Sequence, residues 1–277
     1  FLVLTFIGAI IASLTFQAVL GGGFAVFLAA VPEITPQGWL IVLYTVLFPS
    51  VISQMLYGEF FEVLEENQQW SKIRSTFDSC EGWLDNRQFL KIPEDIFQQL
   101  SSEDTVFTAD LVEFITDEKD SLIPVPLGSQ LNFIPELNHH YDGSYTSGQQ
   151  AKEALLETAY LYLNAPYLWG GKTPFGIDSS GFTQMVYKLN GYSLLRDSRQ
   201  QSTQGTALSF IEESEPGDLA FFDNKDGVID HVGIMMSDNY IIHAHGKVRI
   251  DRIDHSGIYN PELGKHTHQL RVIKKII

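Results

Sequence analysis

The first part of the chain is an almost uninterrupted apolar stretch. Residues 1–58 contain one charged residue, Glu33, and the apolar runs are separated by glycines at 21–23. Each run is long enough for a transmembrane helix of about 20 residues. We therefore expect residues 1–52 to be a helical, membrane-like segment, with a buried helical hairpin as the alternative.

Within this segment, residues 36–51 faintly resemble a terminal helix of drug/metabolite transporters.

The hydrophobic pattern changes from about residue 53. Short runs with alternating or β-branched character at 60–66, 70–74 and 82–85 are typical of strands. Closely spaced short strands with turn residues between them indicate a small barrel. The sequence therefore predicts a small β-domain over residues 53–98.

This region resembles the bacterial SH3-like domains that often precede cell-wall peptidase domains. The resemblance rests on three short motifs: Gly58-Glu59, Trp70 and Glu81-Gly82-Trp83-Leu84. The first strand of such a domain would lie before Ser53, where the apolar segment stands. We therefore expect an incomplete domain.

A second β-rich region is predicted between residues 99 and 148. A short helix at 93–100 precedes it, and strands are expected at 111–116 and 122–127. These elements suggest a second SH3-like unit. The polar, glycine-containing stretch 138–148 is interpreted as a linker.

A helix is expected directly after this linker, at the start of a domain over residues 149–277. Ser147 and Gln150 have the spacing of a capping box, and apolar residues then recur at helical spacing. The helix must stop before Pro166.

Charge and cysteine content narrow the classes of function. The formal net charge is −16, and the sequence contains no basic stripe, which argues against a nucleic-acid partner. The single cysteine, Cys80, cannot form an internal disulfide. Its acidic neighbours favour a protonated thiol, so we expect it to be a partly packed side chain and not a nucleophile.

The most informative segment is the glycine-rich stretch 166–182. It delivers Asp178, Ser179 and Ser180 to the start of a helix, whose buried face continues through Phe182. Unpaired backbone N–H groups and the positive end of the helix dipole meet there. Such a site favours a thiolate and also stabilises an oxyanion.

Two histidines follow on a predicted β-hairpin. His231 begins one strand, and His243 and His245 end the next. Strand alternation places His243 and His245 on the same face, so spacing does not choose between them.

These motifs, in this order, resemble the NlpC family of cell-wall cysteine peptidases over about residues 149–275. The resemblance implies an α+β chain with a papain-like catalytic domain. It places the nucleophile at Ser179, the general base at His231 and the orienting group at His243. It also implies that Tyr167 lies near the oxyanion site, and that Asp178 and Ser180 contact the substrate. The neighbouring Trp169 is expected to be a packing aromatic.

Position 179 departs from the family, which has cysteine there. A hydroxyl is far less ionised than a thiol and needs a site built for serine. We therefore expect a scaffold for cutting the γ-D-glutamyl–L-diamino acid bond of peptidoglycan stem peptides, with little or no turnover. An engineered Cys-to-Ser change and a naturally inactive homologue both explain Ser179. The alternative function is a non-catalytic peptidoglycan-binding envelope protein.

No cofactor or metal is expected, because the family uses none. The pairs His243/His245 and His266/His268 have metal-like spacing, but no thiol or acidic ligand accompanies them in the sequence. The expected partner is a stem peptide or muropeptide, and the expected location is the cell envelope. Residues 1–57 are expected to provide any contact with the membrane.

Overall fold

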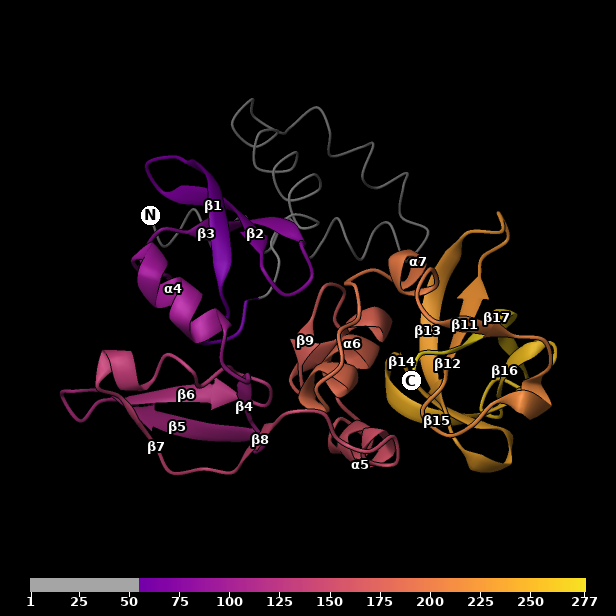
Figure 1. Cartoon of the computed structure of the whole chain (residues 1–277). Coiled ribbons are helices and arrows are strands. Elements are labelled where there is room, and N and C mark those ends of the chain that lie inside the picture. Colours follow the sequence, from indigo (N-terminus) through magenta and orange to yellow (C-terminus); the bar gives the residue numbers. More distant parts are fainter. Residues whose placement is uncertain (1–54) are drawn as a thin grey trace, which may run out of the picture. The chain divides into compact units, whose positions relative to one another are not determined.

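The computed structural model describes residues 55–277 (Figure 1). The predicted apolar segment 1–52 and its membrane contact lie outside these residues. No helix within residues 55–277 is long and apolar enough to cross a membrane.

The described chain begins with a three-stranded antiparallel sheet. Its strands are β1 (Phe61–Glu66), β2 (Trp70–Ser75) and β3 (Glu81–Asp85), paired in the order β1-β2-β3. Ile73 on β2 is fully buried, whereas neighbouring positions alternate with it in exposure. Helix α4 (Glu94–Ser101) follows. The predicted strands and helix are confirmed to within two residues at their ends.

A second β-region follows α4. Strand β5 (Val112–Thr116) pairs with β6 (Leu122–Pro126) and β7 (His140–Tyr141), and β4 (Val106–Thr108) pairs with β8 (Tyr145–Ser147). The two longer strands were predicted.

The interpretation of residues 138–148 as a linker is wrong. Both β7 and β8 lie in this stretch and close the second β-region by pairing with strands about 25 to 40 residues earlier. Such short strands take their stability from these non-local partners, which their polar composition does not reveal.

The capping box predicted at Ser147 does not form. Ser147 is part of strand β8 and pairs with β4. The Gln150 side chain donates to the backbone carbonyl of Ser147 instead. Helix α5 begins later, at Ala154, and extends to Leu161. Its stop before Pro166 is confirmed.

Helix α6 (Ser179–Leu189) is the central element of the C-terminal domain. A two-stranded ribbon of β9 (Lys172–Thr173) and β10 (Gly176–Ile177) leads into it, and the short α7 (Ser198–Gln201) follows it. The predicted helix start at 178–180 is confirmed, and the helix ends just before Gly191, which has a positive φ of 80°.

The C-terminal half forms a sheet that closes on itself (Figure 1). Its order is β11-β17-β12-β13-β14-β15-β16, and the long β17 also pairs with β16. The strands are β11 (Thr206–Leu208), β12 (Leu219–Asp223), β13 (Ile229–Met235), β14 (Tyr240–His245), β15 (Lys247–Asp254), β16 (Gly257–Asn260) and β17 (Lys265–Lys275). The hairpin predicted to carry His231 and His243 is β13–β14.

Helix α6 is buried on every side. The apolar face containing Phe182 and Val186 packs into the main hydrophobic core with residues of β13 and β14. On the polar face, the Gln184 amide donates at 2.9 Å to Asp78, in the turn between β2 and β3. The helix therefore has a fixed position relative to both the barrel and the SH3-like region.

Candidate active site

The start of α6 is held by the Asp178 carboxylate. Its Oδ1 accepts the Gly181 N–H at 2.6 Å, and its Oδ2 accepts the Gly170 N–H at 2.7 Å. A Cβ on Gly181 would lie 2.3 Å from the Gly171 carbonyl oxygen, so only glycine allows this close approach. The loop and the helix start are thereby locked together around position 179.

Ser179 is the first residue of α6 and is 7% exposed. Its hydroxyl makes no hydrogen bond to another residue of 55–277, and neither do the backbone N–H groups of Ser179 and Ser180. These groups sit at the positive end of the helix dipole. Position 179 therefore combines a nucleophile-type side chain with free donors for a negative charge.

His231 and His243 are joined by a hydrogen bond between neighbouring strands. The bond links Nε2 of His231 to Nδ1 of His243 at 2.8 Å, and both rings are buried. Gly233 faces His243 across the ladder, and a Cβ there would lie 2.8 Å from the His243 Cβ. His245 is exposed. His243, and not His245, is therefore hydrogen-bonded to His231, although the His245 ring also lies 6.5 Å from the His231 ring.

Asp251 on β15 extends this pair and was missed from the sequence. Its Oδ2 is 3.1 Å from Nε2 of His243, and Arg249 binds the carboxylate at 2.7 and 3.0 Å. Burial alone would raise the pKa of Asp251, but the bonds from His243 and Arg249 lower it below its ordinary value. No motif in the sequence marks this residue, because its role depends on the register of β14 with β15.

This chain of contacts assigns the protons on both rings. An ionised Asp251 only accepts, so Nε2 of His243 carries a hydrogen. Burial lowers the pKa of His243 and His231, which keeps both rings neutral at neutral pH. Nδ1 of His243 then accepts from Nε2 of His231, which leaves Nδ1 of His231 as the basic nitrogen.

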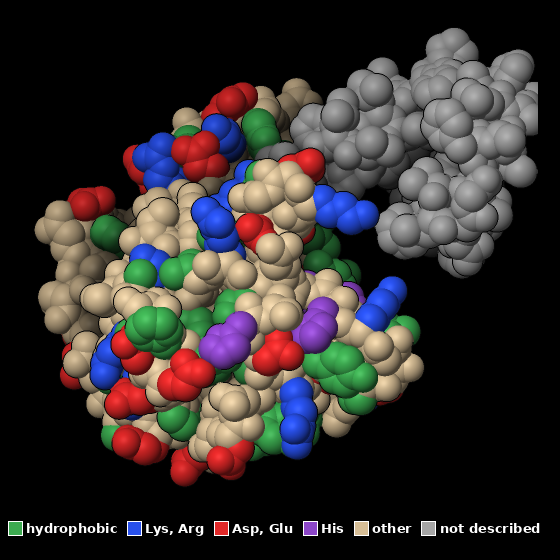
Figure 2. Space-filling model, turned by 90° about the vertical axis from the view of Figure 1, so that its right-hand side faces the viewer, with side chains coloured by type: hydrophobic (Ala, Val, Ile, Leu, Met, Phe, Trp, Pro, Cys, Tyr) green, Lys and Arg blue, Asp and Glu red, His purple; other side chains and the backbone are tan. Residues whose placement is uncertain are grey.

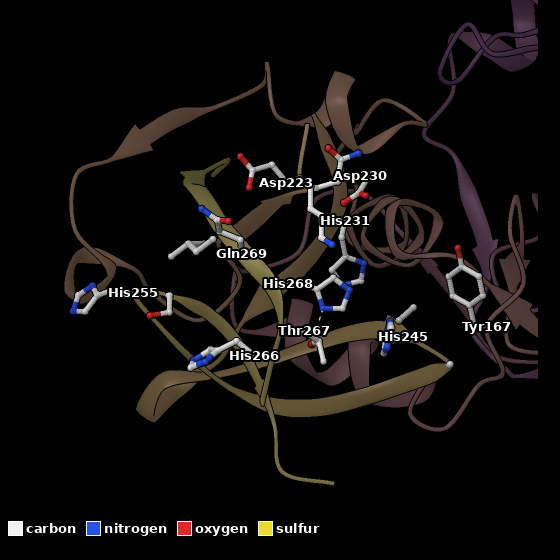
Figure 3. A pocket seen from close by; sticks show the side chains of 16 residues that line it. Tyr167, Asp223, Asp230, His231, His245, His255, His266, Thr267, His268 and Gln269 are labelled. Atoms are coloured by element: carbon white, nitrogen blue, oxygen red, sulfur yellow. Dashed lines mark hydrogen bonds between the residues drawn. The ribbon is translucent and has the colours of Figure 1, made fainter. Parts of the chain in front are cut away.

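A third ring, His268 on β17, stacks on His231. The ring centroids are 4.1 Å apart and the planes differ by 23°. Nδ1 of His268 is 2.9 Å from the Thr267 hydroxyl, and burial together with the nearby His243 lowers the pKa of His268 to about 3. The labelled rings of His231 and His268 lie next to one another in Figure 3. The sequence grouped His268 only with His266, since it could not show that β17 closes the barrel beside β12.

These rings open onto a pocket of about 1040 Å³. His231, His245, His268 and Tyr167 line it, with two further histidines at its far end (Figure 3). Figure 2 shows histidine side chains gathered on the barrel face of the molecule with acidic side chains around them. The pocket can admit a ligand to His231.

The two predicted substrate-contact residues form a network with Arg196. The guanidinium donates to both oxygens of Asp178 at 3.0 and 2.8 Å, and to the Ser180 hydroxyl at 3.0 Å. Burial lowers the pKa of Arg196, but the bond to Asp178 outweighs it and the net pKa is raised. Arg196 was not predicted, because it lies in a loop whose position only the fold decides.

Tyr167 lines the same pocket as His231. Its backbone N–H donates to the Gly246 carbonyl at 3.0 Å. Burial and the nearby Asp178 raise the pKa of the Tyr167 hydroxyl, so it stays a donor at neutral pH. The expectation that Trp169 packs in the interior is wrong: it is 61% exposed, because the glycine loop carries it outward.

Two family profiles match the chain. Residues 164–271 match the NlpC/P60 family, and residues 50–89 match the bacterial dipeptidyl-peptidase SH3 domain. The solved structure of an NlpC/P60 family protein from Bacillus cereus is similar in fold, with a TM-score of 0.67 at 22% identity, covering 81% of each chain.

Two curated relatives extend the comparison. A γ-D-glutamyl-L-lysine dipeptidyl-peptidase from Bacillus cereus is 27% identical over 224 residues, which is 69% of this chain and 66% of the relative. The protein of the same name from Bacillus subtilis is 26% identical over 219 residues, covering 69% of this chain and 71% of the relative. The chain thus spans about two thirds of the length of these relatives. The chain therefore contains an NlpC/P60 domain, which includes Ser179, His231 and His243, and a bacterial SH3 domain ahead of it.

Proposed function

We propose that this protein has the architecture of a peptidoglycan hydrolase that cuts stem peptides between γ-D-glutamate and an L-diamino acid. The observation that carries the proposal is the hydrogen-bonded series His231–His243–Asp251 in the domain whose α6 starts at position 179. The names of the two Bacillus relatives support the choice of bond.

The geometry supports an acyl-transfer mechanism at position 179. The side-chain nucleophile attacks the γ-carbonyl carbon, and Nδ1 of His231 accepts the proton that the nucleophile loses. The free N–H groups at the start of α6 and the Tyr167 hydroxyl stabilise the developing oxyanion. The protonated His231 then gives its proton to the leaving amine, and water hydrolyses the acyl intermediate.

The network of Arg196 with Asp178 and Ser180 lies beside this reaction centre. Its guanidinium is a fixed positive charge, which suits the free carboxylate of a γ-linked glutamate. We propose that it holds the acyl half of the substrate.

Ser179 makes catalysis by this form weak. The buried, neutral His231 suits a base, but a hydroxyl needs far stronger activation than a thiol, and its oxygen is not hydrogen-bonded to that base. A second candidate function, peptidoglycan binding without cleavage, is favoured by this one residue. In both cases we propose that the protein acts in the cell envelope, with the segment before residue 58 as its tether.

The change Ser179→Cys separates the two functions. We expect the cysteine variant to release L-alanyl-γ-D-glutamate from a stem tripeptide, while the serine form binds the peptide and releases little. Adding His231→Ala to the cysteine variant should lower turnover by roughly 10²–10⁴-fold, the usual contribution of a general base. Product formation followed by chromatography measures both.

Binding must be followed in the same samples. If Ser179→Cys binds the tripeptide but does not cleave it, the binding function replaces the hydrolase. If neither form binds or cleaves, the assignment of the substrate class is overturned.

A further inference from the structure

One side chain from each of three barrel strands meets beside the pocket that His231 and His268 line. His231 on β13, His243 on β14 and His268 on β17 each offer a ring nitrogen, and these atoms all lie within 4.8 Å of one another. The sequence places His268 25 residues after His243 and shows no such grouping. The mechanism above uses only two of the three rings.

The donor set has the chemistry of a transition-metal site. Neutral imidazoles bind Zn²⁺, Cu²⁺ and Ni²⁺, whereas Mg²⁺ and Ca²⁺ prefer oxygen ligands. Burial lowers the pKa of all three rings, so each has a lone pair available at neutral pH. Three histidines with an open fourth position are a recurrent zinc arrangement.

Two of these rings are oriented by hydrogen bonds to the ring nitrogen that faces away from the cluster, as in established metal sites. Asp251 accepts from Nε2 of His243, and the Thr267 hydroxyl contacts Nδ1 of His268. Partners of this kind fix the ring that faces the metal and raise its basicity. His268 therefore presents Nε2, and His243 presents Nδ1, to the space between the rings.

The ring nitrogens, all within 4.8 Å of one another, can be compared with the spacing of a tetrahedral site. With Zn–N bonds near 2.0–2.1 Å, ligand nitrogens lie about 3.3 Å apart. The His231–His243 contact is 2.8 Å, so a cation that replaces the shared proton moves these nitrogens apart by roughly half an ångström. The His268 nitrogen lies within 4.8 Å of the other two, on a ring that is not fully buried.

We propose that His231, His243 and His268 bind one Zn²⁺-class cation, with water or a substrate atom from the pocket as the fourth ligand. The site is reached through the pocket that His231 and His268 line. If the proposed hydrolase function holds, the cation binds Nε2 of His231, whose hydrogen moves to Nδ1, and the His231–His243 hydrogen bond is lost. Nδ1 of His231 is then protonated and no longer acts as the base. The metal is then an inhibitor of peptide cleavage.

The binding test uses the serine protein after chelator treatment and without a polyhistidine tag. Calorimetric titration with Zn²⁺ should show one site per chain, and Co²⁺ should give the intense visible absorption of a tetrahedral centre. The variant His268→Gln should weaken binding at least about tenfold. The matched control is His266→Gln, because His266 lines the same pocket but bonds to the exposed Asp254.

Each outcome decides the proposal. No Zn²⁺ site, or equal loss of affinity in both variants, overturns it. A separate assay tests inhibition by adding Zn²⁺ to the Ser179→Cys protein, with and without His268→Gln. Equal inhibition of cleavage in the two proteins would overturn the proposal that Zn²⁺ inhibits through this site. Because binding is measured directly in the serine form, its result is independent of whether any variant cleaves peptide.

Discussion

Gly233 shows how a single missing side chain shapes the site. It faces His243 across the β13–β14 ladder, with room only for a hydrogen. We predict that Gly233→Ala pushes His243 away from His231 and costs about 1–3 kcal/mol, the usual range for overpacking a core. Urea unfolding measures the stability, and turnover of the Ser179→Cys form measures the site.

The comparison for this substitution is Gly227→Ala, at a turn where an added Cβ meets nothing within 4 Å. The positive φ of 72° at position 227 makes an alanine there strained, yet the added methyl group touches no site residue. A Gly233→Ala protein that keeps full stability and turnover would contradict the close-packing explanation.

Asp251 acts on the reaction through His243, and so is a positioning residue. We predict that Asp251→Asn, in the Ser179→Cys background, lowers turnover by about 10–100-fold, as loss of an orienting partner typically does. The ring-nitrogen chemical shifts of His231 and His243 should also change, because the tautomers are no longer set. A purely structural role would leave those shifts in place.

The control for Asp251 is Asp254→Asn on the same strand, whose carboxylate bonds to the exposed His266. Unchanged nitrogen shifts and a normal pH profile in Asp251→Asn would show that His243 needs no such partner.

At the scale of elements, the polar face of α6 is held by a buried charge cluster. Glu59 contacts Lys188 at 2.6 Å and Lys172 at 3.3 Å, and all three side chains are at most 5% exposed. Removing one member leaves uncompensated buried charge. We predict that Glu59→Gln destabilises the fold by about 3 kcal/mol in chemical unfolding, whereas Glu62→Gln, an exposed partner of Arg74, has little effect.

The same cluster gives a pH dependence of defined sign. Burial alone would raise the pKa of Glu59, but Lys188 and Lys172 lower it from 4.5 to about 2. Its stabilisation is therefore complete above pH 4.5 and is lost as the pH falls through about 2. The difference in stability between the unsubstituted protein and Glu59→Gln should shrink over that interval; a constant difference would contradict the assignment.

At the scale of the molecule, α6 joins the SH3-like region to the peptidase domain. Its apolar face lies in the main core, and its Gln184 and Lys188 side chains are bonded to Asp78 and Glu59. We predict that residues 55–277 unfold in one cooperative transition. Calorimetry should give equal calorimetric and van't Hoff enthalpies, and two resolved transitions would count against this coupling.

The family resemblance in the sequence was carried by local features. The helix start at Asp178, the strand alternation around His231 and His243, and the short strands at 60–85 all depend on residues close in the chain. Such patterns report backbone conformation and burial within one element, and for these elements the structure agrees with them. The prediction of a linker at 138–148 was wrong because the strands in that stretch are stabilised by partners far away in the chain.

The sequence alone therefore determined the resemblance to the NlpC family, the order of the main elements and the residue at position 179. Only the tertiary structure decided between His243 and His245, and brought Asp251, Arg196 and His268 to the site. These contacts depend on strand register and on the closure of the barrel by β17. Register is set by packing between residues far apart in the chain, which no local pattern records.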